Sequence, residues 1–215
     1  RVDDTNVLLE ATRSQADQHP ALRRLGILLT GIEAATPVME AVPTNLRSGL
    51  LAALRDSDVQ LALLPAVLAD TTVEALLELP LPAVVQSACV DSVTDKERLA
   101  ALREAHTGRN KSVYRRSEEC LAAIVAEEAR HAAFIVSCEE LVNEFELLAA
   151  APWDGHLATR LDLIEKRWAA ATGSSAYQVE VVLSGRLEAA RSTIGHTLVE
   201  MPRRIAAAEQ AAAEI

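Results

Sequence analysis

Hydrophobic residues recur at three- and four-residue steps along almost the whole chain, which is the spacing of amphipathic α-helices. In the first half these runs are short and are interrupted by proline, as at Pro20, Pro37 and Pro43. Because proline is tolerated mainly in the first turn of a helix, such interruptions predict a succession of short helices.

The second half has a different pattern. From Ser112 to Ala150 no glycine or proline occurs and the apolar spacing continues, which predicts one long amphipathic helix. Turn-forming residues at 151–155 and 172–175 then separate two further helices, at about 156–172 and from about 176 onward. Three helices joined by short turns are expected to pack antiparallel.

Part of the first half is repeated. Residues 85–95 echo residues 59–70, and a weaker third copy begins at Val113, so the period is about 26 to 28 residues. In the clearest copy, Asp95 stands where the N-cap of a second helix is expected, and Gly108 is expected at the end of that helix. Helical hairpins repeated at this scale bury a core only against their neighbours.

These paired helices, over residues 46–121, resemble HEAT-like repeats, in which an Asp caps one helix and an alanine-containing apolar seam faces the next pair. The period is shorter than in HEAT repeats, and Pro65 is expected to kink the first copy. The alternative is that Ala- and Leu-rich hairpins share this appearance without being true repeats. We predict an all-α fold: a short HEAT-like helical-hairpin solenoid over residues 1–111, continuing into a long-helix antiparallel bundle or coiled-coil-like hairpin over residues 112–215.

The second half also carries a family resemblance. The stretch LDLIEKRW at 161–168 ends in Trp168 and is followed by RLEAAR at 186–191. Together they resemble a bacterial family designated only as domain of unknown function 349, and residues 95–121 are similar to the segment that precedes these units in that family. The resemblance implies a long helical protein with HEAT-like segments and no established activity. Arg1 at the start and the Ala-rich run at 205–215 lead us to expect a fragment of a longer polypeptide.

Composition narrows the class of protein. The chain has 215 residues, of which half are hydrophobic, and this excludes a disordered chain. Only two Trp, two Tyr and two Phe are present, so the apolar mass is mainly Ala, Leu and Val, which favours closely packed helices.

Charge and cysteine usage bear on partners and location. A net charge of −10 argues against bulk attraction to nucleic acid or anionic membranes. The sequence shows no apolar run long enough to span a membrane and no signal peptide, so no membrane association is expected. Cys89, Cys120 and Cys138 form no CxxC pair and lie in apolar helical contexts, which is typical of reduced, buried thiols and predicts a cytoplasmic protein. No cofactor is expected.

One basic cluster is conspicuous in this acidic chain, and it lies at the start of the long helix. We take as candidate binding residues Arg109, Lys111, Tyr114, Arg115 and Arg116. Cations beside a helix N-terminus are suited to a phosphate or an acidic partner, and Tyr114 is able to stack on a base. The alternative is that the cations pair with nearby acids, for which the candidates are Asp91, Asp95, Glu118 and Glu119.

A second candidate site is Glu128-Ala129-Arg130-His131, a Glu-x-x-His half-motif of the kind that ferritin-like di-metal proteins place on a bundle helix. Glu128 and His131 each follow an apolar seam residue by seven positions, so both are expected to face inward. No other His has a Glu three residues before it, and a di-metal site requires such a second half-motif. The alternative is a hydrogen-bonded polar pair.

The sequence contains none of the common hydrolase, protease or nucleotide-binding motifs. We therefore predict a non-enzymatic helical scaffold or interaction module of a larger cytoplasmic bacterial protein, with a protein partner of unknown identity and an undetermined oligomeric state. Two alternatives stay open: a nucleic-acid-associated helical protein that uses the basic cluster at 109–116, and a ferritin-like metal protein centred on Glu128 and His131.

Overall fold

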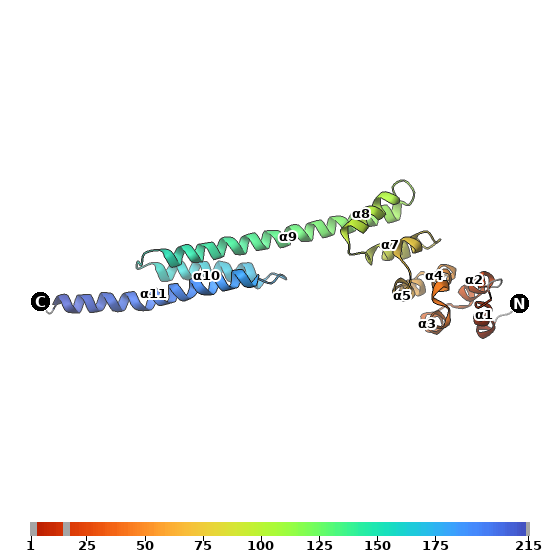
Figure 1. The fold of residues 1–215 in the computed structure, drawn as a ribbon, viewed down its shortest axis with the longest axis horizontal. Coiled ribbons are helices and arrows are strands. Elements are labelled where there is room, and N and C mark those ends of the chain that lie inside the picture. Colours follow the sequence, from red (N-terminus) through yellow and green to blue (C-terminus); the bar gives the residue numbers. More distant parts are fainter. Residues whose placement is uncertain (1–3, 15–17, 214–215) are drawn as a thin grey trace. The chain divides into compact units, whose positions relative to one another are not determined.

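A computed structural model describes residues 4–14 and 18–213. Over these residues the protein consists of eleven α-helices without any β-strand, which confirms the predicted all-α class (Figure 1). In chain order the helices are Thr5–Ala11 (α1), Gln18–Leu28 (α2), Ile32–Ala41 (α3), Thr44–Ala53 (α4), Ser57–Leu68 (α5), Val73–Leu77 (α6), Ala83–Asp91 (α7), Lys96–Ala105 (α8), Lys111–Ala150 (α9), Leu157–Gly173 (α10) and Val181–Ala213 (α11).

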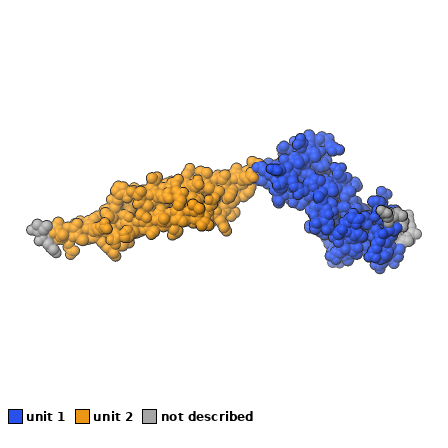
Figure 2. Space-filling view, viewed as in Figure 1, with its two compact units in different colours: residues 1–124 blue, residues 125–215 orange. Residues whose placement is uncertain are grey.

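The chain divides into two compact units, unit 1 at Arg1–Ile124 and unit 2 at Val125–Ile215 (Figure 2). The long helix predicted over residues 112–150 is α9, and it contributes side chains to the hydrophobic cores of both units. The change of pattern that the sequence shows at residues 111–112 coincides with the start of α9.

Unit 1 is built from short helices that contact their neighbours along the chain. Helix α2 contacts α4, α3 contacts α5, and α5 in turn contacts α7. A single cluster of buried, almost entirely aliphatic side chains extends through these helices from Leu8 to Val113. No short helix has a core of its own, so the apolar face of each is covered only by the helices beside it.

Local sequence signals set several helix ends in unit 1. The side chains of Asp56 and Asp95 accept hydrogen bonds from the first-turn N–H groups of α5 and α8, and the Asp95 bond to the Arg98 N–H is 2.7 Å long. This confirms the predicted Asp95 cap. Gly108 lies three residues beyond the end of α8, farther than expected, and its φ of 69° belongs to the left-handed region that favours glycine.

Two prolines lie inside short helices. Pro37 lies inside α3 instead of between helices, contrary to expectation, whereas Pro65 lies inside α5, where the sequence placed it within a helix. Both side chains are exposed, so their rings face away from the core of unit 1. Each helix continues past its proline with one fewer backbone donor.

Unit 2 is a three-helix arrangement of the second part of α9 with α10 and α11 (Figure 1). Its core draws on all three helices and consists of Cys138, Val142, Phe145, Leu148, Leu157, Ile164, Leu183, Leu187, Ala190 and Ile194. Trp153 and Trp168 pack against this core, and the Trp168 ring meets the Phe145 ring edge-on at 6.5 Å between centroids. The two tryptophans therefore fill the seam between the helices, where amphipathic aromatic rings pack well.

The closest backbone approach at a glycine is that of α2 to the end of α4. A Cβ atom added at Gly26 would lie 2.2 Å from the carbonyl oxygen of Ala53, and backbone cannot yield as a flexible side chain does. We therefore expect Gly26→Ala to destabilise unit 1 by about 1–3 kcal/mol, the usual cost of overpacking. The measurement is the midpoint of chemical unfolding followed by circular dichroism.

Gly195 provides the matched control, because it lies inside α11 with nothing within 4 Å of an added Cβ. Gly195→Ala should stabilise the protein by about 0.5–1 kcal/mol, since alanine loses less backbone entropy in a helix. Equal effects of the two substitutions would contradict the close approach at Gly26.

Candidate functional site

The basic cluster at the start of α9 borders an open groove of unit 1 with a volume of about 430 Å³. Three helices line it: α5, α7 and the first turns of α9. The lining residues are Leu61, Val84, Ser87, Ala88, Asp91, Ser112, Arg115, Arg116 and Glu119.

Helical spacing explains why these side chains gather here. On α7 the lining positions are three or four residues apart, and the same is true of Ser112, Arg115, Arg116 and Glu119 on α9. Residues at these spacings share one helix face. Ser87 and Asp91 on α7 therefore face the polar side chains of α9, while Leu61 and Val84 supply apolar surface from α5 and α7.

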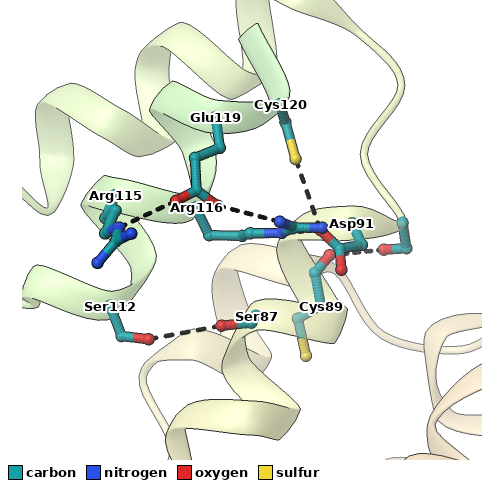
Figure 3. A network of polar contacts seen from close by, with 9 residues as sticks. Ser87, Cys89, Asp91, Ser112, Arg115, Arg116, Glu119 and Cys120 are labelled. Carbon is teal, nitrogen blue, oxygen red and sulfur yellow. Dashed lines mark hydrogen bonds and ion pairs between the residues drawn. The ribbon is translucent and has the colours of Figure 1, made fainter. Parts of the chain in front are cut away.

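Arg116 is the centre of the polar network in this groove (Figure 3). Its Nε donates to Asp91 Oδ1 at 2.5 Å and its Nη1 donates to Glu119 Oε2 at 3.0 Å, while Arg115 Nε donates to Glu119 Oε1 at 2.9 Å. The hydrogen bonds to Asp91 and Glu119 raise the pKa of Arg116, and those from Arg116 and Arg115 lower the pKa of Glu119. Two guanidinium groups thus face two carboxylates, and the four groups carry no net charge.

Asn110 determines how α9 begins beside this network. Its Oδ1 accepts hydrogen bonds from the backbone N–H groups of Ser112 and Val113, both at 3.2 Å, and its Nδ2 donates to Gln86 Oε1 at 2.9 Å. Two of the helix donors that would attract an anion are therefore already bonded within the protein. Alongside, the hydroxyl oxygens of Ser87 and Ser112 lie 3.5 Å apart.

The cysteines are not activated for nucleophilic chemistry. Burial raises the pKa of the Cys120 thiol, and its hydrogen bond to Asp91 Oδ1 at 3.5 Å raises it further. Burial also raises the pKa of Cys138 and brings that of Cys89 to about 11. All three thiols are therefore protonated at neutral pH, whereas a nucleophilic cysteine requires a lowered pKa.

The structure separates the predicted binding residues into two groups. Arg115 and Arg116 line the groove and pair with Asp91 and Glu119, two of the acids that the sequence offered as partners. Arg109 and Lys111 are exposed, and neither forms an ion pair with an acid in the described part of the chain; Tyr114 is half-buried. None of these three lines the groove.

Sequence reasoning did not identify the α5 and α7 side of the groove, apart from Asp91. Ser87 pairs with Ser112 over the same 25-residue separation that joins Asp91 to Arg116. These side chains share the groove because α5, α7 and α9 pack together, which the sequence of a single helix does not show.

Glu128 and His131 do not face inward, contrary to expectation, because both side chains are exposed on α9. The core of unit 2 begins only near Phe134, so the preceding turns of α9 have no seam for them to enter. The His131 ring instead lies 4.9 Å from the Tyr177 ring, and the Tyr177 hydroxyl donates to Glu127 Oε1 at 2.6 Å. Within residues 4–14 and 18–213, no group of three or more His, Cys, Asp or Glu side chains is arranged to hold a metal ion.

The chain matches no protein-family model, no curated protein and no solved structure. None of the helices in the described ranges combines the length and apolar character needed to cross a lipid bilayer. The groove on α5, α7 and α9 is therefore characterised by its own chemistry: apolar side chains beside a charge-balanced group of arginines and carboxylates.

The electrostatics of the groove give a test at Cys120. Asp91→Asn removes the carboxylate that raises the Cys120 pKa, so the thiolate fraction should rise and Cys120 should be alkylated faster at pH 7.5. Arg116→Gln removes a cation that lowers this pKa, so alkylation should slow. Iodoacetamide labelling followed by peptide mass spectrometry measures both rates.

Cys89 and Cys138 are the internal references for this experiment, because both are buried. Their labelling rates should stay unchanged in both variants. If both variants changed the alkylation rate of Cys120 in the same direction, the cause would be a general opening of the groove and not its charges.

Proposed function

We propose that this chain is a non-enzymatic, HEAT-like helical interaction module of a larger cytoplasmic bacterial protein, related to the domain of unknown function 349 type. Its role is to present a protein-binding surface on stacked hairpins of unit 1. The groove on α5, α7 and α9 is the surface that we assign to the partner.

The observation that supports this proposal is the similar sequence separation of three ion pairs in unit 1. Arg47 pairs with Asp70 across 23 residues, and Glu74 accepts from Arg98 across 24. The Asp91–Arg116 pair spans 25 residues. A nearly constant separation is what stacked repeats produce, and stacked repeats form extended surfaces on which partners bind.

The chemistry of the groove favours a protein over a nucleic acid. Arg115 and Arg116 are balanced by Asp91 and Glu119, so few counterions would be released if a phosphate backbone bound there. The exposed part of Val84 and the partly buried Leu61 offer apolar contact beside hydrogen-bonding hydroxyls. Apolar surface with a polar rim is typical of protein interfaces.

A site-specific cross-linker tests this assignment. With p-benzoylphenylalanine in place of Val84, we expect one discrete protein adduct from a lysate of the source cell, because Val84 lines the groove and is 50% exposed. The matched control places the same group at Ile27 on α2, which is 39% exposed and outside the groove. Gel mobility and mass spectrometry identify the adducts.

Competition sharpens this experiment. Excess wild-type protein should abolish the Val84 adduct, whereas a Val84→Glu competitor should not. The same adducts at both positions, or none specific to position 84, would count against a partner in this groove. An adduct removed by nuclease would instead support the nucleic-acid alternative.

A further inference from the structure

Unit 2 exposes two leucines side by side on the outer surface of α9 and α10. Leu147 is 72% exposed and Leu163 is 60% exposed, and both line a shallow groove of about 340 Å³. The complete lining is Glu144, Leu147, Leu148, Ala151, Arg160, Leu163, Ile164 and Arg167. No α11 residue lines this groove, although Leu148 and Ile164 at its base also belong to the core of unit 2.

The charged groups around these leucines neutralise one another. Arg167 forms a two-pronged pair with Glu144, with N···O distances of 2.5 and 2.9 Å, and Arg160 pairs with Asp154 at 2.8 Å. An acidic or a basic partner would therefore gain little from this rim. The surface is suited to an occupant that is apolar at its centre and carries both signs of charge around it.

The size of the surface also limits the occupant. Helix α10 has 17 residues, which corresponds to about 25 Å at the helical rise. Two helices packed about 10 Å apart present a face about 20 Å wide. Such a face buries about 500 Å² per copy, or about 1,000 Å² in a pair. This total reaches the lower limit for a specific interface. It does so only if the occupant is also two helices wide.

A second copy of this chain satisfies each of these requirements. We propose that unit 2 self-associates through the α9–α10 surface about a two-fold axis that runs parallel to the helices. That axis places α9 of one copy against α10 of the other, so Leu147 meets Leu163 of the partner subunit and Glu144 faces Arg167 of the partner subunit. An axis across the helices would instead oppose Arg160 to the partner's Arg167, and like charges destabilise an interface.

The resulting interface is isologous: the same surface acts on both copies and each contact occurs twice. The inference concerns unit 2 alone and is independent of the groove proposed for a partner on unit 1. A negative result for the unit 1 groove therefore does not affect the proposal for unit 2, and a negative result for unit 2 does not affect the proposal for unit 1.

Sedimentation velocity of the whole chain over about 5–500 μM tests the pairing, because an interface of this area is expected to dissociate in the micromolar range. The wild-type protein should form a dimer. Leu147→Asp or Leu163→Asp should raise the dissociation constant by roughly 100-fold, since the axis introduces each charge twice. Val182→Asp is the matched control, because Val182 on α11 is 71% exposed and outside the groove.

Both leucines are largely exposed, so the aspartate variants should keep the wild-type circular dichroism spectrum and unfolding midpoint. A wild-type protein that stays monomeric at 500 μM overturns the proposal. So does a dimer that neither aspartate substitution weakens.

Disulfide formation tests the direction of the axis. A mixture of Leu147→Cys and Leu163→Cys proteins should form an intermolecular disulfide on mild oxidation, at a rate at least about tenfold above either variant alone. Wild-type protein, which retains Cys89, Cys120 and Cys138, supplies the background rate. Faster cross-linking of Leu147→Cys protein with itself would overturn the parallel axis.

Discussion

The apolar face of each short helix in unit 1 is buried only by its neighbours, and the rest of that unit depends on this constraint. Its first eight helices have between 5 and 12 residues. Isolated helices below about 12–15 residues are marginal in water. The stacking contacts therefore maintain the helices themselves, and the groove on α5, α7 and α9 exists only while three helices stay in register.

In unit 2 the length of one helix decides what is buried. Helix α10 has 17 residues, whereas α9 and α11 have 40 and 33. The core is confined to the portion of the longer helices that α10 accompanies, and residues 125–133 of α9 are exposed although they are helical. Their alanine content sustains the helix without burial.

Much of the fold was accessible from the sequence because apolar periodicity and turn residues act locally. The long helix begins at Lys111, one residue before its predicted start, and Asp95 caps α8 as expected. Helix α11 begins at Val181, about five residues later than predicted. Val179 packs on the core, as a seam residue of a helix would, but it lies in a non-helical segment before α11. Apolar periodicity alone does not show whether such a residue is helical.

The sites were harder to predict, since they depend on which helices meet. The seven-residue steps to Glu128 and His131 continue a seam, but a seam position is buried only where a partner helix lies beside it. The groove needs α5, α7 and α9 together, and one sequence shows only the α9 part as a run of cations. Its acid partners Asp91 and Glu119 were among the candidates that the sequence offered, and the structure pairs both with Arg116.

Although the chain is acidic overall, its arginines form ion pairs that join different helices. In unit 2, Arg167, Arg186 and Arg191 each form a two-pronged pair with a carboxylate on another helix, one for each pair of helices. In unit 1, Arg47, Arg98 and Arg116 each pair with a carboxylate 23 to 25 residues away in the chain. Leu, Val and Ala seams with few aromatic rings tolerate small shifts in register, whereas a planar guanidinium meets a carboxylate in one geometry. We therefore infer that these pairs contribute more to the register of the helices than to their stability, because partly exposed ion pairs add little free energy.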